Sequence, residues 1–598
     1  MKRNYIGMSC TFHDPALAIV DSEGQVVFAE ATERYMQNKR AINCPVDDVN
    51  RIGNLIDEHC EKDADLVVAK TWSGRPLVYG LTRMAFELGA RWGPSFAPKK
   101  VDGTPPSFSL VKSRRPLLQF RNWLVRSHIN YYDQTSTNLG IRVALQAVRR
   151  HASGNNRPAS APQPAGKKLF QARFDHHLTH AAAACYSSPF RDAACAVIDG
   201  YGEFTSTAYY AYSDGKIEKL KQPQKSPASL GFFYGFICYA CGFDPIKGEE
   251  WKVMGLAPYG KFDQRIYDEL KAWQRIDGLR VDWGSRDSMQ KTNLAALRDY
   301  DRADLAYNGQ RVFQELMEEL LGNLAGLGIS KNLVLSGGCA LNSSTNGRIL
   351  ERTPFENLYV YCAPGDDGNA VGAALLAYHE DNPGRLPSFE TGSPYLGSAM
   401  SQETLEHTRT LGKIPGRSSW PGRVHEKAAE LLTRGKIIGW VQGRAEFGPR
   451  ALGNRSILAD PRQPDIKDAL NDRVKFREEF RPFAPSILHE YGREYFERYQ
   501  ESPYMDRTLL FRPAVRDKVP GVVHADGTGR LQTVKKEWNE RYYLLIEAFR
   551  KLTGVPIVLN TSFNVMGKPI IHSVEDAIAV FYTSGLDALV IEDELIEK

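Results

Sequence analysis

The sequence contains no run of apolar residues long enough to cross a membrane. The nearest candidate, around Phe232 to Ala240, is short and aromatic, whereas a membrane helix needs about 18 to 20 apolar residues. A secretory signal peptide is not expected either, because His13, Asp14 and Pro15 interrupt the region where its apolar core would lie. We therefore expect a cytoplasmic protein with no membrane partner.

A strong charge excess and a disulfide pattern are also missing. The chain has 76 Lys plus Arg and 71 Asp plus Glu, a net charge of +5 over 598 residues, which does not require a nucleic-acid partner. Nine cysteines, scattered and odd in number, favour reduced thiols over a secreted disulfide framework. Cys238 and Cys241 form a single CxxC without a second pair, so we interpret them as buried thiols rather than zinc ligands.

The composition is that of a packed globular protein with more than one domain. Hydrophobic residues make up 42% and charged residues 25%, which excludes disorder and low complexity, and the length is too great for one ordinary domain. A Pro-, Gly- and Ser-rich segment at 381–397 is typical of a linker. We expect a first domain over 1–390, with a basic, aromatic insertion at about 72–168, and a second over 398–598.

A strand and turn pattern occurs twice in the first domain. Its first copy lies at 5–8, 16–20 and 25–29, and its second at 194–199, 206–212 and 216–220. Two β-rich halves, each opening with a hairpin and followed by helices, resemble the duplicated architecture of actin-like ATPases and sugar kinases. The expected fold class is therefore α/β, with this duplicated domain followed by a C-terminal α/β domain.

Two histidines and two aspartates form a candidate metal site. His176 and His180 are four residues apart in a segment predicted to be helical, so both imidazoles project from one face. Asp199 ends an apolar strand, and Asp366 lies in a turn before a small-residue helix. This mixed nitrogen and oxygen set suits iron or zinc, although either aspartate alone is equally typical of a turn cap. The neighbouring Asp367 leaves the fourth ligand ambiguous by one residue.

A glycine pair in LSGGCALN indicates a ligand-binding turn. Gly337 and Gly338 follow an apolar strand and precede a helix, which lets backbone N–H groups approach an anion or a nucleotide. Taken alone, the pair is no stronger a signal than a tight turn, but PGDDGNAVGAA follows it closely. We assign Gly337, Gly338 and Asn342 to nucleotide binding.

The second domain carries a dense group of cations and short polar side chains. Because Gly, Pro, Phe and Ala surround many of them, an unpaired guanidinium there would be costly without an anion. The pattern indicates a site for phosphate groups. Its members are Arg444, Arg450 and Arg455 in GRAEFGPRALGNR, Lys475, Arg477 and Arg481 in KFREEFR, Arg530 in HADGTGR, and Ser562 and Asn564 in LNTSFN.

These segments resemble the O-carbamoyltransferase family of nodulation-factor and antibiotic biosynthesis, which includes the aminoglycoside carbamoyltransferase. The most specific matches are FGPRALGNRSILADPR, LNDRVKFREEFRPFAPSIL, HADGTGRLQTV and LNTSFNVMGKPI, together with HHLTHAAAA, DGYGE, LSGGCALN and PGDDGNAVGAA. The resemblance covers most of the chain and is thinnest in the insertion. It implies an actin-like first domain similar to threonylcarbamoyl-transfer proteins, and a second domain, a twisted open α/β sheet, similar to threonylcarbamoyl-adenylate synthases.

The resemblance also implies a two-step reaction that uses ATP with Mg²⁺. Carbamoyl phosphate and ATP would give carbamoyl-adenylate in the second domain, and the carbamoyl group would pass to a hydroxyl of a small molecule of secondary metabolism, such as an antibiotic, in the first. Lys475-Phe476-Arg477 and Ser562-Phe563-Asn564 match the family's KxR and SxN motifs, which bind nucleotide and carbamate.

Residue roles follow from the same resemblance. His13, beside Asp14, is the candidate general base for the acceptor hydroxyl, although without the resemblance HDP reads as a turn. Asp366 is preferred to Asp367 because it aligns with the aspartate of the related tRNA-modification motif. The implied ligands of a single Fe²⁺ are His176, His180, Asp199 and Asp366, and the groups implied to neutralise carbamoyl phosphate and ATP are Arg450, Lys475, Arg481 and Arg530.

Other functions remain open at this point. An enzyme that makes threonylcarbamoyl-adenylate for tRNA modification would be expected to have a more basic surface. A sugar-type kinase would leave the histidine pair and the C-terminal cations without a task. A non-catalytic nucleotide-binding scaffold would be favoured by loss of Lys475, Arg450 or His176, all of which are present. Neither the acceptor nor the choice between monomer and homodimer can be read from the residues.

Overall fold

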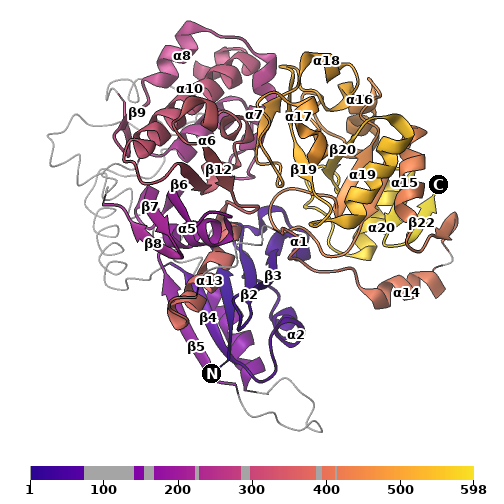
Figure 1. Ribbon diagram of the computed structural model, residues 1–598, viewed down its shortest axis with the longest axis horizontal. Helices are drawn as coiled ribbons and strands as arrows, with labels where there is room; N and C mark the ends of the chain where they lie inside the picture. The colour runs from indigo at the N-terminus through magenta and orange to yellow at the C-terminus, as the bar shows by residue number, and fades with distance from the viewer. Residues whose placement is uncertain are drawn as a thin grey trace, which may run out of the picture.

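The computed structural model describes residues 2–11, 13–72, 140–153, 167–221, 228–284, 296–385, 393–410, 412 and 414–598. Most of the expected insertion at 72–168, and residues 386–392 of the expected linker, lie outside the described residues. Figure 1 shows two lobes built from the first two thirds of the chain and, beside them, a body in orange and yellow built from the last third.

The first lobe contains a five-stranded sheet in the order β3-β2-β1-β4-β5. Its hairpin strands pair antiparallel, whereas β1 with β4 and β4 with β5 run parallel. Helix α2 (Val49–His59) and the helical residues 140–152 cover one face with apolar side chains. The strands are β1 (Arg3–Ser9), β2 (Ala16–Val20), β3 (Val26–Ala31), β4 (Asp65–Thr71) and β5 (Leu169–Phe174).

The second lobe repeats this topology. Its sheet has the order β12-β11-β6-β7-β8, again an antiparallel hairpin on one side of the first strand and two parallel strands on the other. The equal strand order of the two sheets confirms the predicted duplication and its actin-like plan. The strands are β6 (Asp192–Gly202), β7 (Thr205–Ser213), β8 (Lys216–Lys219), β11 (Asn332–Ser336) and β12 (Asn357–Val360).

Two helices rich in small residues lie between the two sheets. Helix α5 (His176–Ser187) packs on the second sheet, α13 (Asn369–Asp381) packs on the first, and the two contact each other. The contact is close because Gly372 of α13 faces the backbone carbonyl of Thr179, where any Cβ would collide. On its outer face the second sheet is covered by α6 (Leu230–Ala240), α7 (Glu250–Leu256) and the long α10 (Arg302–Ala325).

The C-terminal body is built on an eight-stranded mixed sheet in the order β13-β22-β21-β14-β15-β20-β16-β19. Helices α15 (Val424–Thr433), α19 (Glu540–Thr553) and α20 (Val574–Thr583) pack against it. The α/β character expected for this part is confirmed. The strands are β13 (Arg417–Ser419), β14 (Ile438–Val441), β15 (Arg455–Ala459), β16 (Ala484–Leu488), β19 (Gln532–Val534), β20 (Ile557–Ser562), β21 (Ala588–Ile591) and β22 (Glu594–Glu597).

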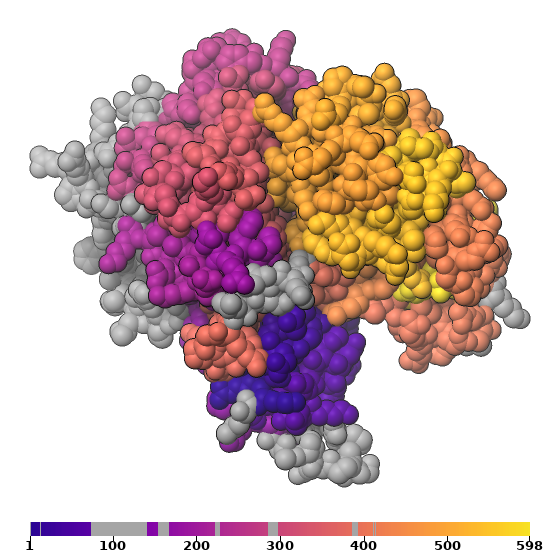
Figure 2. Space-filling model, viewed as in Figure 1, coloured from indigo at the N-terminus to yellow at the C-terminus, as the bar shows by residue number. Residues whose placement is uncertain are grey.

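The C-terminal body packs directly against the two lobes, as the continuous seam in Figure 2 shows. Lys252 of α7 donates to Glu478 at 2.7 Å, and the ring of Trp251 lies 3.9 Å below the guanidinium of Arg481. At a second point of contact, Arg34 donates to the carbonyl of Gly448 at 2.7 Å. Polar and stacking contacts therefore fix the two parts in one arrangement. The expected boundary between 390 and 398 stays a prediction.

All nine cysteines are free thiols, and both cysteines of the CxxC are fully buried, as predicted. Within the residues that the structure describes, none of the helices combines the length and the apolar character that crossing a bilayer demands.

Candidate functional site

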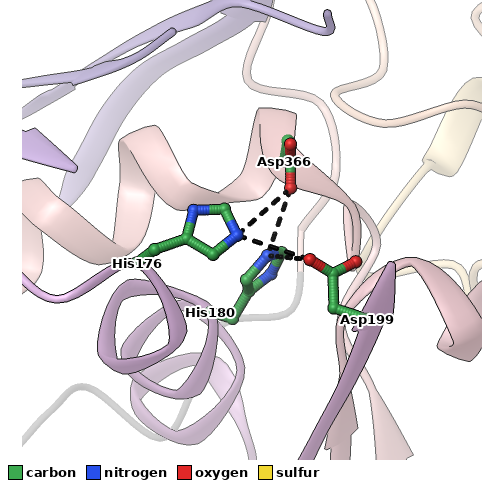
Figure 3. A group of neighbouring side chains, drawn as sticks. All are labelled: His176, His180, Asp199 and Asp366. Atoms are coloured by element: carbon green, nitrogen blue, oxygen red, sulfur yellow. Dashed lines mark hydrogen bonds and ion pairs between the residues drawn. The ribbon is translucent and has the colours of Figure 1, made fainter. Parts of the chain in front are cut away.

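Four side chains from both lobes converge at the contact between them (Figure 3). His176 and His180 come from the first two turns of α5, Asp199 from β6, and Asp366 from the turn that precedes α13. Their ligand atoms all lie within 4.8 Å of one another. Asp366 Oδ1 is 3.3 Å from His180 Nε2, and Asp199 Oδ2 is 3.4 Å from His176 Nε2.

The two carboxylates are oriented so that each presents one oxygen to the histidines. Gly338 N–H donates to Asp199 Oδ1 at 2.9 Å, and Thr11 Oγ1 donates to Asp366 Oδ2 at 2.9 Å. The other oxygens face Nε2 atoms at distances that suit donors sharing one ion, for which metal–ligand bonds of about 2.0 to 2.2 Å place neighbours about 3.0 to 3.5 Å apart. His180 Nε2 is buried and has no hydrogen-bond partner among the described residues. This donor set fits a divalent transition metal.

The charge of the cluster also favours a bound cation. Burial alone would lower the pKa of His176, but Asp199 and Asp366 raise it to about 9. Two buried carboxylates thus create a negative potential that a cation would neutralise. The neighbouring Asp367 lies apart from the cluster: burial, then Asp14 and Glu33, raise its pKa to about 7, and it accepts from Gly368 N–H at 3.1 Å.

His13 lies beside this cluster and is held by two charged residues, Asp14 and Arg40. Its Nδ1 is 2.8 Å from Asp14 Oδ2 and 3.9 Å from Asp366 Oδ2. Arg40 donates to the same oxygen, Asp14 Oδ2, through Nη2 at 2.9 Å and Nε at 3.2 Å. Burial opposes the charged imidazole, yet Asp14 raises the pKa of His13 overall. Arg40 and Asp14 therefore favour the ring with a proton on Nδ1.

The glycine pair serves the same cluster. Gly337 has φ = 90°, and a Cβ there would collide with the carbonyl of Ile198 in the adjacent β6. This close approach places Gly338 N–H on Asp199. The side chain of Asn342 instead exchanges hydrogen bonds with Gln310, at 3.0 and 3.1 Å, inside the second lobe. The assignment of Gly337, Gly338 and Asn342 to a nucleotide stays a prediction.

In the C-terminal body, the two predicted motifs contact each other. Lys475, only 2% exposed at the end of a short π-helix, donates to Asn564 Oδ1 at 2.8 Å and to the Asn564 carbonyl at 3.0 Å. It also contacts the carbonyl of Ser562 and its hydroxyl, the latter at 3.3 Å. Burial, and then Arg477 and Arg481, hold the pKa of Lys475 well below its usual value.

Arginines surround this lysine without matching carboxylates. In the part of the chain that the structure describes, no ion pair or carboxylate hydrogen bond involves Arg450, Arg477 or Arg530. Burial lowers the pKa of Arg450 to about 10 and, with Arg481, that of Arg477 to about 9. Burial, Arg450 and Arg477 hold the pKa of Arg530 well below its usual value. The charges of Arg450, Lys475, Arg477 and Arg530 act on one another, and these four side chains form a site suited to anions, which we call the cation pocket.

Comparison with known proteins shows which family the chain belongs to. Family models described as the carbamoyltransferase N-terminus and C-terminus match residues 159–375 and 429–598. Together they cover more than half of the chain, and both the metal cluster and the cation pocket lie within them. The chain belongs to the carbamoyltransferase family. It is therefore a carbamoyltransferase, as the motifs predicted.

The chain is also similar to individual proteins over much of its length. An uncharacterized protein of Synechocystis sp. is 32% identical over 99% of this chain and 96% of its own. Nodulation protein NolO of Bradyrhizobium diazoefficiens is 39% identical over 71% of this chain and 79% of its own. Among solved structures, full-length HypF in its phosphate- and nucleotide-bound form overlaps 64% of this chain and 56% of its own, with 12% identity and a TM-score of 0.32.

Two arginines that the sequence grouped with the anion site have other tasks in this carbamoyltransferase. Arg455 lies within β15, is fully buried and donates to four backbone carbonyls, among them Gln442 at 2.7 Å and Ser398 at 3.0 Å. Arg444 donates to the carbonyls of Val27, at 2.8 Å, and Gly397. Protein carbonyls thus accept most of the hydrogen bonds of these two guanidinium groups, and Arg455 Nε has no hydrogen-bond partner among the described residues. A place for them in an anion site stays a prediction.

Arg481 occupies the seam between the parts of the molecule. It donates to Glu478 at 3.1 Å and stacks on Trp251 of α7, while its charge still acts on Lys475. The KFREEFR segment therefore faces the cation pocket through Lys475 and Arg477, and the lobes through Glu478 and Arg481.

Sequence reasoning missed three residues of these sites. Thr11 orients Asp366, Arg40 supports Asp14, and His524 lies beside Arg530 in the cation pocket. For Thr11 and His524 a signal was available, since they belong to TFHDP and HADGTGR, where only His13 and Arg530 were chosen. Arg40 carried no signal, because it lies 26 residues after Asp14 in the chain and its guanidinium meets that carboxylate only in the folded protein.

Proposed function

We propose that this carbamoyltransferase makes carbamoyl-adenylate in its C-terminal body and transfers the carbamoyl group to a hydroxyl at the contact between its lobes. The observation that carries the proposal is the pocket around Lys475, where Arg450, Arg477 and Arg530 lie without carboxylate partners. Such a pocket suits substrates with several phosphate groups, as carbamoyl phosphate and ATP are.

The first half-reaction balances with one water molecule. Carbamoyl phosphate and water give carbamate and phosphate, and a carbamate oxygen then attacks the α-phosphorus of ATP, which enters with Mg²⁺, and expels pyrophosphate. The arginines and Lys475 would stabilise the charge that builds on the leaving groups, a contribution of about 2 to 4 kcal/mol for a preorganised donor. Ser562 and Asn564 hold Lys475 in place by the hydrogen bonds described above.

The second half-reaction takes place at the metal cluster. His13, with Nδ1 held by Asp14, would accept the proton of the acceptor hydroxyl at Nε2 as the oxygen attacks the carbamoyl carbon and AMP departs. His176, His180, Asp199 and Asp366 would hold one Fe²⁺, which supplies a Lewis acid that polarises the carbamoyl group. The aspartates and Thr11 keep this cluster beside His13.

We propose a natural-product hydroxyl as the acceptor. Relatives named nodulation proteins support a product of secondary metabolism, the class to which antibiotics belong. We place the reaction in the cytoplasm, in line with the nine free thiols.

One assay without an acceptor tests the first half. The purified protein, loaded with Fe²⁺, is incubated with carbamoyl phosphate, ATP and Mg²⁺, and pyrophosphate and carbamoyl-adenylate are measured. We expect both products, each dependent on carbamoyl phosphate. An adenylate formed from threonine and bicarbonate, with none from carbamoyl phosphate, would overturn the proposal in favour of the tRNA-type reaction. Absence of product with both substrate sets would favour an enzyme that needs its acceptor for the first step, or a non-catalytic scaffold.

A further inference from the structure

We propose that Phe476 and Met566 bind the adenine base of ATP at the mouth of the cation pocket, with the ring of Phe476 as the stacking face. The inference rests on the function proposed above, which brings ATP to this pocket. It goes further by naming the residues that hold the base rather than the phosphate groups.

Phe476 is the exposed member of an aromatic segment. It is 50% exposed, although its neighbours in the chain, Lys475 and Arg477, belong to the cation pocket. The other two phenylalanines of KFREEFRPF are packed: Phe480 lies against the apolar core of the second lobe, and Phe483 is 1% exposed, with its ring 4.5 Å from the guanidinium of Arg477. A phenyl ring in water forgoes the free energy that burial of its apolar surface would give. Phe476 therefore presents an apolar face that the fold itself does not use.

The backbone of Phe476 is held in the left-handed region. The residue follows the π-helix Asn471–Lys475 and has φ = 49° and ψ = 55°. A residue with a Cβ is disfavoured there, whereas glycine adopts this conformation readily. Backbone outliers of this kind cluster at ligand-binding sites, and single π-helical turns are also frequent at functional sites. The sequence thus keeps a bulky ring at a position where stability alone would favour glycine.

A second exposed apolar side chain lies at the same part of the pocket. Met566, 57% exposed, belongs to the turn after β20, which Asn564 Nδ2 closes by donating to the carbonyl of Lys568 at 2.6 Å. Asn564 Oδ1 accepts from Lys475 Nζ at 2.8 Å. One hydrogen bond therefore joins the residue before Phe476 to the residue two positions before Met566, and it brings the two exposed side chains to the same region.

The shape of ATP decides what these side chains would hold. The phosphate groups and the base are at opposite ends of the molecule, so phosphates bound at the recessed cations leave the base nearer the surface. Lys475 is 2% exposed and the adjacent Phe476 is 50% exposed, so the recess and its mouth are one residue apart. A purine has a flat π-face that stacks on an aromatic ring, and a methionine side chain adapts to irregular apolar contacts. The acceptor is a less suitable occupant, because its hydroxyl reacts at the metal cluster between the lobes.

The test measures binding of ATP with Mg²⁺ to the full-length protein by isothermal titration calorimetry, without carbamoyl phosphate. Inorganic tripolyphosphate, which has three phosphate groups and no base, is the second probe. Phe476→Gly should raise the Kd of ATP about 5- to 150-fold, as expected for the loss of stacking on one base, and should leave the Kd of tripolyphosphate unchanged. The variant should fold, because the ring is exposed and the backbone conformation suits glycine.

Further variants separate stacking from a general effect on the pocket. Phe476→Trp keeps a stacking face and should retain most of the affinity for ATP. Its added fluorescence, taken as the difference from the wild type, should be quenched by ATP and not by tripolyphosphate. Met566→Ala should raise the Kd of ATP by less than Phe476→Gly. Tyr582→Ala removes an equally exposed ring, at 50%, from α20; it is the matched control and should leave both constants unchanged.

Several outcomes would overturn the inference. An equal loss of affinity for ATP and tripolyphosphate in Phe476→Gly would show general damage to the pocket, and an unchanged Kd of ATP would show that the ring does not touch the base. Equal quenching of Phe476→Trp by both probes would attribute the signal to the phosphate groups. Pyrophosphate release tests the proposed function separately. ATP binding that depends on the ring, in a protein that releases no pyrophosphate with carbamoyl phosphate, would refute that function and support the base site.

Discussion

Lys475 Nζ lies 2.8 Å from Asn564 Oδ1, which joins two motifs that are 89 residues apart in the sequence. The bond ties the end of a π-helix to the end of the central strand β20. Because Ser562 Oγ also donates to Asn564 Oδ1, at 2.7 Å, the three side chains form one polar unit at the floor of the cation pocket. These three residues are distinct from the histidines and aspartates of the candidate metal site, so a substitution can change one group without changing the other.

The first prediction separates the two half-reactions. Lys475→Ala should lower carbamoyl-adenylate formation by about 10²- to 10³-fold, since it removes a preorganised donor. His13→Asn should leave adenylate formation intact and abolish transfer to an acceptor. Pyrophosphate release and carbamoylated product are the two readouts. Lys475→Ala should lower both, because transfer consumes the adenylate, and a loss of pyrophosphate release in His13→Asn as large as that in Lys475→Ala would contradict the division of labour.

The second prediction concerns stability. Arg477 is a recessed cation without a carboxylate partner, and burial, followed by the charge of Arg481, lowers its pKa to about 9. Arg477→Met should therefore stabilise the ligand-free protein by about 1 to 4 kcal/mol while reducing adenylate formation. Thermal unfolding with and without pyrophosphate is the measurement. Pyrophosphate should raise the Tm of the wild type more than that of the variant, and equal shifts would argue against an anion site at Arg477.

The third prediction tests whether Asp14 and Arg40 orient His13. Asp14→Asn keeps the shape but removes the charge that faces Nδ1, so transfer should fall by about 10²- to 10⁴-fold with adenylate formation preserved. Arg40→Met, one step further from the reacting atoms, should cost less. A transfer rate unaffected by Asp14→Asn would exclude His13 as a base held by that carboxylate.

The fourth prediction identifies the metal ligand in the aspartate pair. Asp366→Asn should reduce bound metal, measured by inductively coupled plasma mass spectrometry, because Asp366 Oδ1 lies 3.3 Å from His180 Nε2. Asp367→Asn, next in the chain and outside the cluster, is the matched control and should keep its metal. Pyrophosphate release should survive in both variants. Retention of metal by Asp366→Asn would remove that residue from the set.

The fifth prediction is a pH dependence of stability at the first lobe. Asp47 forms an ion pair with Arg51, whose Nη1 lies 2.9 Å from Asp47 Oδ2. Burial nevertheless outweighs this ion pair and raises the pKa of Asp47 to about 6. Between its unfolded pKa of about 3.9 and about 6, the folded protein binds more protons than the unfolded chain, so this contribution to stability is lost as the pH rises through that window. Asp47→Asn should flatten the dependence by on the order of 2 kcal/mol.

Thermal unfolding of wild type and Asp47→Asn from pH 4 to pH 8 measures the difference. The wild type should lose more stability than the variant as the pH rises. A difference of the opposite sign would mean that the ion pair with Arg51 dominates over burial.

Local patterns were enough for the elements that depend on neighbours in the chain. The two hairpins follow from alternating apolar residues and turns, and the i, i+4 spacing of His176 and His180 follows from one helix. The duplication could be proposed for the same reason, since each half repeats the pattern. Arg444 and Arg455 show the limit of such reasoning, because a guanidinium among Gly and Ala has the same local signature whether it meets an anion or a carbonyl.

The sequence by itself determined the α/β class and the duplicated first domain, and it singled out the four residues that cluster at the candidate metal site and the KxR and SxN motifs, because each depends on short-range periodicity or on a contiguous motif. Only the tertiary structure decided which atoms meet. It placed Gly338 on Asp199, Thr11 on Asp366 and Lys475 on Asn564, and it left Arg450 and Arg530 without carboxylates. Those pairings depend on strands and loops that are distant in the chain, and on the free energy of burying charge, which acts only once the protein is folded.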